Sequence, residues 1–183
     1  PHVPLMSLPM VFGTDHHTIP ASVPYLTPSE PVPEHLKFIQ PAGGISIGLL
    51  WASNPDNKAM YRNKSISLER LMPCFTSALQ LNLIELHCMQ FGADRDQLNP
   101  WREMHGITDW KDDLRDFSDT AHLVKQLDLV ICVDTAVAHL AGALNRPTWV
   151  LLPYNADFRW LRDRDDSPWY PSMRLFRQTA RND

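Results

Sequence analysis

The stretch "LVICVDTAVAHLAGALNRPTWVLL" (residues 129–152) constrains the fold more than any other part of the chain. It places two short apolar runs, 129–133 and 148–152, on either side of a helical segment at 135–144. Continuous apolar runs are typical of strands that are buried on both faces, and a strand–helix–strand order joins parallel strands. The stretch therefore predicts a βαβ unit within a parallel sheet.

The same alternation of strands and helices continues on both sides of this unit. The helix expected at 67–80 should have Ser67 as its N-cap and a kink at Pro73. The helix expected at 117–128 should be capped near Ser118 or Asp119. Together these segments predict an α/β fold with three layers, in which helices cover both faces of a parallel sheet. Strands are expected at 45–51, 83–89, 107–110 and 173–178, and helices at 67–80 and 117–128.

Residues 1–41 differ from the rest because they contain nine of the sixteen prolines. Such a segment cannot sustain a helix or a central strand, so we expect a tail or interdomain linker that lies on a surface. Its Asp15-His16-His17 stretch is interpreted as a polar loop, because no further metal ligand follows at a suitable spacing. Since the chain begins with Pro1, we expect a fragment or a processed product.

Composition excludes several classes of protein. The net charge of −4 gives no basic footprint for a nucleic acid. No apolar run approaches the roughly 18 residues of a membrane span, and no signal peptide is visible. The three cysteines, Cys74, Cys88 and Cys132, are widely spaced within apolar runs, which predicts buried free thiols and a reducing, cytoplasmic location.

Polar residues follow the strand at 129–133. Ligands of parallel α/β sheets bind outside the carboxyl ends of strands, and a helix start offers free amides to a phosphate. Asp134 and Thr135 lie there, Ala136 leaves room for a ligand, and His139 shares a helix face with Thr135. The spacing leaves two readings open: a phosphate site, or an ordinary start at which Asp134 caps the helix and His139 is structural.

The segment 52–67 is a long connection between a strand and a helix, and such connections are either functional or mobile. It carries three cations, Lys58, Arg62 and Lys64, as well as the small polar residues Ser53 and Asn54. These residues suit a diphosphate, although a solvated basic loop would carry the same types of residue.

Three blocks of sequence resemble a known family. "DLVICVDTAVAHLAGALNRPTWVLLP", followed by "DFRWLRDRDDSPWYPSMRLFRQ", and the earlier "GLLWASNPDNKAMYRNKSISL" are similar to the C-terminal half of bacterial family 9, heptosyltransferase-like glycosyltransferases. The version that it most resembles often follows tetratricopeptide repeats. The resemblance implies one half of a GT-B fold: a Rossmann-like domain at 42–183, preceded at 1–41 by the proline-rich end of another domain and a linker.

The family further implies a function. Its C-terminal domain binds a nucleotide-sugar donor, transfer is inverting, and neither a metal ion nor a cofactor is required. The acceptor, whether glycan, lipid or protein, remains open. The catalytic base is expected in the absent N-terminal domain, so this chain should be inactive alone, with His139 as its one candidate for a catalytic role.

Site residues are carried over by position. The family pattern places the donor diphosphate and ribose at Asp134, Thr135, Ala136 and His139, with glycine usual in place of Ala136. Its phosphate-binding cation falls on Lys64 with Arg62 as the rival, and Ser53 and Asn54 should face the phosphates. Asp157, Arg159 and Trp160 match a motif to which no role is assigned.

Two other functions remain open at this point. The chain can be a non-catalytic protein-interaction module that kept the fold, which suits an association with repeats that bind proteins. It can also be part of a nucleotide-sugar epimerase. The nucleotide base, the sugar and the oligomeric state do not follow from the sequence.

Overall fold

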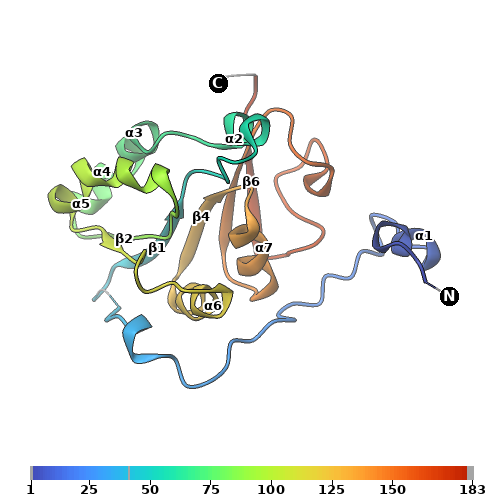
Figure 1. Ribbon diagram of the computed structural model, residues 1–183, viewed down its shortest axis with the longest axis horizontal. Coiled ribbons are helices and arrows are strands. Elements are labelled where there is room, and N and C mark those ends of the chain that lie inside the picture. The colour runs from blue at the N-terminus through green and yellow to red at the C-terminus, as the bar shows by residue number, and fades with distance from the viewer. Residues whose placement is uncertain (1, 41, 181–183) are drawn as a thin grey trace.

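Six short segments form the six strands of one parallel sheet in the computed structural model, which describes residues 2–40 and 42–180. The spatial order is β3-β2-β1-β4-β5-β6, and it reverses direction between β1 and β4 (Figure 1). This is the order of a Rossmann sheet, so the predicted fold class is confirmed. The strands are β1 (Ile45–Leu50), β2 (Ile84–Cys88), β3 (Thr108–Asp109), β4 (Leu129–Val133), β5 (Thr148–Leu152) and β6 (Met173–Arg177).

Helices cover both faces of the sheet and divide the core in two. Successive residues of β4 point to opposite faces, so Val130 and Cys132 pack with α6 and α7, while Ile131 packs on the other side with α3 and α4. The helices are α1 (Leu8–Val11), α2 (Lys58–Lys64), α3 (Leu68–Leu71), α4 (Thr76–Gln80), α5 (Asn99–His105), α6 (Phe117–Gln126) and α7 (Ala136–Ala143). Short 3-10 turns lie at Leu5–Ser7, Glu34–Leu36, Met72–Cys74, Ala93–Leu98 and Phe158–Trp160.

Several local expectations need correction. The helix expected at 67–80 is broken by Pro73 into α3, the turn Met72–Cys74 and α4, and Cys74 at this break is exposed rather than buried. The segment 52–67 is not a plain loop, because Asn57 caps α2 within it by accepting a hydrogen bond from the Met60 amide. The helix α5 was not expected, since its residues show little apolar periodicity.

The cap predicted for α6 was misplaced, and the reading in which Asp134 caps α7 is not the one that the structure shows. The side chain of Asp116 caps α6 by accepting from the Asp119 amide, whereas Ser118 and Asp119 lie inside the helix. At α7 the N-cap is Thr135, in extended backbone conformation, and Asp134 is free for another partner. Each helix thus begins one or more residues away from the expected cap.

Residues 20–40, which we call the strap, lie against α6 and α7 instead of leaving the body of the protein (Figure 1). The amides of Tyr25 and Leu26 donate to the Ala143 carbonyl at 3.0 and 3.3 Å. Leu36 is fully buried in the core, and Gln126 donates to its carbonyl at 3.0 Å. The strap therefore packs as part of the domain that it precedes. The predicted boundary between two domains, at residues 41 and 42, stays a prediction.

Two further expectations were a polar loop at Asp15-His16-His17 and the lack of a membrane-spanning segment. Asp15 accepts hydrogen bonds from the amides of His17 and Thr18, as a polar turn would. None of the described helices combines the length and apolar character that a membrane crossing requires. Residues 1, 41 and 181–183, which the two predicted domain ranges include, lie outside the described residues.

Candidate functional site

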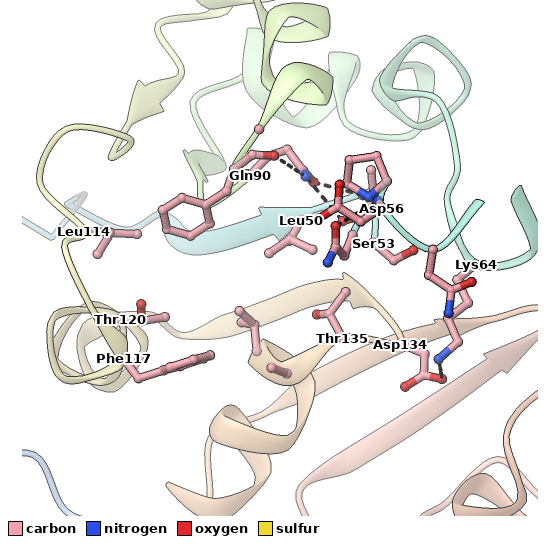
Figure 2. Close-up of a pocket in the computed structure, with 18 of the residues that line it drawn as sticks. Leu50, Ser53, Asp56, Lys64, Gln90, Leu114, Phe117, Thr120, Asp134 and Thr135 are labelled. Carbon is pink, nitrogen blue, oxygen red and sulfur yellow. Dashed lines mark hydrogen bonds and ion pairs between the residues drawn. The ribbon is translucent and has the colours of Figure 1, made fainter. Parts of the chain in front are cut away.

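A cavity of about 920 Å³ opens at the carboxyl ends of β1, β2 and β4, and we call it the switch-point cavity. It is lined by the segments that follow these strands and by the residues that lead into α6 (Figure 2). The strand order reverses between β1 and β4, and ligands of open parallel sheets bind at this reversal. The fold therefore places the cavity where a Rossmann-like domain has its ligand.

The cavity has two unlike walls (Figure 2). The polar wall comes from the segments after β1 and β4 and from α2. The apolar wall comes from the last residue of β1, the segment after β2 and the residues at the start of α6, and two of its rings, Phe91 and Phe117, are exposed. The polar wall consists of Ser53, Asn54, Lys64, Asp134 and Thr135, and the apolar wall of Leu50, Phe91, Leu114 and Phe117.

Lys64 and Asp134 form a buried ion pair in the polar wall. The last residue of α2 reaches the first residue after β4, and the Nζ to Oδ2 distance is 2.6 Å. Their side chains are only 11% and 3% exposed, so water stabilises neither charge well and each is compensated by the other. The pair fixes α2 to the end of β4, and it already neutralises the cation that the sequence assigned to phosphate.

Thr135 presents a polar group to the cavity without a partner. Its Oγ1 atom is buried and has no hydrogen bond to any described residue, and it does not cap α7. Buried hydroxyls in native proteins are nearly always satisfied, so this one is a candidate for ligand contact. Ala136 also lines the cavity and is exposed beside the free amides of the first turn of α7.

The structure brings Ser53 and Asn54 to the polar wall as well. The Ser53 amide donates to Ser65 Oγ at 3.0 Å, and Asn54 Oδ1 accepts from the Asp56 amide at 3.0 Å. These bonds stabilise the tight turn between β1 and α2. Both residues line the cavity, as the sequence-based placement beside phosphates requires.

Arg62 and His139 do not line this cavity. Arg62 is exposed on α2, so of the two rival cations Lys64 is the one at the cavity. The ring of His139 stacks on Trp160 with centroids 5.1 Å apart, and its Nδ1 atom lies 3.2 Å from the hydroxyl of Tyr170. Burial lowers the pKa of His139, which favours a neutral ring behind the polar wall.

The motif left without a role now has a structural one. Trp160 is fully buried and supports His139, while Asp157 caps the turn Phe158–Trp160 by accepting from the Arg159 amide at 3.1 Å. Asp157 also pairs with the Arg159 guanidinium at 3.3 Å. The motif therefore shapes the segment after β5 and holds a ring behind α7.

Sequence reasoning missed the contribution of the segment after β2. Gln90 is buried, and its Oε1 accepts from the amides of Trp51 and Ala52 at 3.1 and 2.9 Å. Its Nε2 donates to the Phe91 carbonyl at 2.9 Å, so one side chain ties the segments after β1 and β2 together. The signal was available, since Gln90 and Phe91 follow a predicted strand as Asp134 follows another.

Charges around the cavity do not by themselves favour an anion. Its lining carries the cations Lys64 and Arg115 against the carboxylates Asp56, Asp116 and Asp134. Asp134 pairs with Lys64, and Arg115 pairs with Asp119 at 2.8 Å. An anionic ligand would therefore depend on the helix-start amides of α7 more than on free cations.

One family model matches part of the chain. Residues 115–160 match the model of "Glycosyltransferase family 9 (heptosyltransferase)", and this segment runs from the entrance of α6 to the turn after β5. The chain is 30% identical to Protein FlbA of Caulobacter vibrioides over 138 residues. This aligned region covers 73% of this chain and 22% of FlbA. The matched family segment contains Asp134, Thr135, Ala136 and His139.

Solved structures share the fold. E. coli heptosyltransferase WaaC with ADP aligns with a TM-score of 0.55 at 16% identity, over 74% of this chain and 38% of WaaC. A family 9 glycosyl transferase of Veillonella parvula aligns with a TM-score of 0.55 at 14% identity, over 74% of this chain and 35% of its own. E. coli ADP-heptose LPS heptosyltransferase II aligns with a TM-score of 0.54 at 14% identity, over 74% of this chain and 39% of its own.

These matches confirm the resemblance to family 9 glycosyltransferases and to their Rossmann-like fold. The chain spans 22% of the length of FlbA and 35% to 39% of these three solved structures. The association with tetratricopeptide repeats and the bacterial, cytoplasmic setting stay predictions.

Proposed function

We propose that the chain is the domain of an inverting, metal-independent glycosyltransferase that binds the nucleotide-diphosphate-sugar donor. The observation that carries the proposal is the switch-point cavity, with the start of α7 and the unpartnered Thr135 hydroxyl at its polar wall. The family segment covers this same wall, and the similar WaaC structures contain ADP or ADP-2-deoxy-2-fluoro heptose.

The two walls suggest how a donor would lie. Its diphosphate would contact the first amides of α7 and the hydroxyl of Thr135, where the helix dipole favours negative charge. Its base would lie along Phe91 and Phe117, whose exposed rings can stack on a flat heterocycle. This orientation uses both walls and brings the charged part to the side with hydrogen-bond donors.

In transfer, the polar wall would act on the leaving group. As the glycosidic bond to the diphosphate breaks, negative charge grows on the leaving oxygen, and the fixed amide dipoles at the start of α7 would stabilise it. The base that deprotonates the acceptor is assigned to another domain. On this proposal the chain by itself binds the donor and transfers nothing.

Thr135→Val is the sharpest test, because valine has the same shape and the hydroxyl makes no hydrogen bond to any residue that the structure describes. Isothermal titration with ADP, UDP and GDP at millimolar concentrations should show binding of at least one nucleotide. The substitution should weaken that binding about tenfold, since it removes one hydrogen bond to a charged group.

Thr108→Val is the matched control, because Thr108 is exposed on β3 and does not line the cavity. It should leave the affinity unchanged. Absence of binding by all three nucleotides, in protein with an intact circular dichroism spectrum, would overturn the proposal. Equal weakening by both substitutions would also contradict it.

One observation favours a second function, a non-catalytic interaction module. Lys64 is already neutralised by Asp134, and the lining carries more carboxylates than cations. A module of this kind would bind none of the three nucleotides. The full-length protein would then hydrolyse and transfer nothing, and substitutions in either wall would have no effect.

A further inference from the structure

A second cavity, of about 600 Å³, opens at the carboxyl ends of β5 and β6, and we call it the β5–β6 cavity. Three segments line it: residues 154–156 after β5, 161–163, and 177–179 at the end of β6. None of these residues lines the switch-point cavity, although both cavities open at the carboxyl edge of the same sheet.

Arg177 brings to this cavity a cation that no carboxylate contacts among the described residues, although Asp163 lines the same cavity. Its side chain is half-buried, its Nε donates to the Arg164 carbonyl at 3.1 Å, and its Nη2 donates to the Trp160 carbonyl. Among the described residues, no carboxylate oxygen lies within 4.0 Å of its guanidinium. Burial lowers the pKa of Arg177, and the nearby Asp163 carboxylate only partly opposes this effect. A partly buried charge without a partner is unfavourable, so an anion in this cavity would be stabilised.

Arg162 adds a second guanidinium to the same cavity. It is exposed, and in the described part of the chain no carboxylate lies within 4.0 Å of it either. Its neighbours behave differently: Arg159 pairs with Asp157 at 3.3 Å, and Arg164 pairs with Asp166 at 2.5 Å. Arg162 and Arg177 therefore both line the cavity without a contacting carboxylate from the described residues, whereas Arg159 and Arg164 are paired outside it.

The backbone between them is held in an unfavourable conformation. Leu161 has φ 52° and ψ −159°, and Asp163 has φ 53°, values that side-chain-bearing residues rarely adopt. Arg177 bonds to the carbonyls on both sides of this stretch, at Trp160 and Arg164, and so holds it in place. Such strain persists where surrounding contacts fix it, and it clusters at functional sites.

We propose that the β5–β6 cavity is a binding site for an oxyanion, either a phosphate or a carboxylate, held by Arg162 and Arg177. Guanidinium groups suit both anions because their planar forks donate two parallel hydrogen bonds. Asn63 of α2 donates to the Asn155 carbonyl at 3.3 Å, so the rim of this cavity is connected to the helix that carries Lys64. An anionic reactant bound here would lie on the same edge of the sheet as the switch-point cavity.

Titration of the ¹⁵N-labelled chain with inorganic phosphate, and separately with acetate at equal ionic strength, tests the proposal. Amide signals of residues 155, 161–163 and 177 should shift with saturation. The anion that saturates at the lower concentration identifies the preferred class. If neither anion shifts the amide signals of these residues, the proposal is wrong.

Matched variants locate the site. Arg162→Gln should weaken anion binding about tenfold, because it removes a charge-assisted pair from an exposed side chain without disturbing the fold. Arg177→Lys keeps the charge but not the fork, and should also weaken binding. Arg174→Gln, on the same strand but outside the cavity, should have no effect. Equal weakening by Arg174→Gln would show only general attraction to a cation and would contradict the site.

The proposal stands apart from the nucleotide-binding proposal. Arg162→Gln should leave the affinity for ADP at the switch-point cavity unchanged. If no nucleotide binds while phosphate or acetate still shifts residues 161–163, the donor-binding function is wrong and the anion site holds. The reverse result would leave the donor site in place and refute the anion site.

Discussion

In the polar wall of the switch-point cavity, Lys64 and Asp134 are buried and already paired with each other, whereas the apolar wall carries aromatic rings that remain in solvent. Lys64 and Asp134 are 11% and 3% exposed, while Phe91 and Phe117 are 44% and 60% exposed. The polar wall is thus formed before a ligand arrives, and the apolar wall has surface left to bury. We infer that the apolar wall supplies binding energy and the polar wall fixes the orientation.

Lys64→Met should have the largest effect, and it falls on stability. It leaves the Asp134 carboxylate buried without its cation, which lowers the free energy of unfolding by about 3–5 kcal/mol. Urea denaturation followed by circular dichroism measures the change. Lys58→Met, at the exposed start of the same helix, should change it by less than about 0.5 kcal/mol. Equal stability of both variants would mean that the polar wall is not preformed.

Acid should destabilise the core beneath the walls by the next largest amount. His87 is buried, its Nδ1 accepts from Trp110 Nε1 at 3.0 Å, and burial lowers its pKa from 6.5 to about 4. Between these pH values the unfolded chain binds a proton that the folded chain does not, so stability is lost as the pH falls. The loss should reach about 3 kcal/mol, and the walls are therefore best compared at pH 7 or above.

His87→Gln checks this pH effect, because glutamine keeps an acceptor for Trp110 but does not titrate. Denaturation between pH 7 and pH 4 should then give a flatter profile than that of the unsubstituted chain. An unchanged profile would assign the acid sensitivity to other groups, such as His139, whose pKa burial also lowers.

Phe117→Ala tests the apolar wall. Because the ring is largely exposed, stability should hardly change, whereas loss of stacking should weaken ADP binding about fivefold. Phe158→Ala is the matched control, since Phe158 is equally exposed but lies outside the cavity. Titration calorimetry measures both. An unaffected affinity for Phe117→Ala, beside a large loss for Thr135→Val, would leave the polar wall as the only binding surface.

The sheet could be predicted from the sequence because its signal is local. The runs 129–133 and 148–152 coincide with β4 and β5, since strands buried on both faces are continuously apolar. The polar residues after β1 and β4 could then be placed at one edge by a general property of parallel sheets. For this reason Ser53, Lys64 and Thr135 were correctly brought together.

What could not be predicted depends on contacts between distant segments. The pairing of Lys64 with Asp134 requires α2 to form within 52–67 and to end against β4, which periodicity does not reveal. The helical spacing placed Thr135 and His139 on one face, but Trp160 and Tyr170, from after β5, decide where the His139 ring lies. The role of Gln90 likewise follows from the pairing of β1 with β2.

Arg115→Gln should have the smallest effect, and it sharpens the division between the walls. Arg115 is the second cation that lines the cavity, but its side chain is 67% exposed and pairs with Asp119 one turn along the chain. Because the Arg115 guanidinium is well solvated, its loss should change ADP affinity less than about twofold in calorimetry. A tenfold loss would mean that the diphosphate lies beside Arg115, at the end of the cavity with Phe117. The orientation of the donor would then be the reverse of the one proposed, with its base against Lys64 and Thr135.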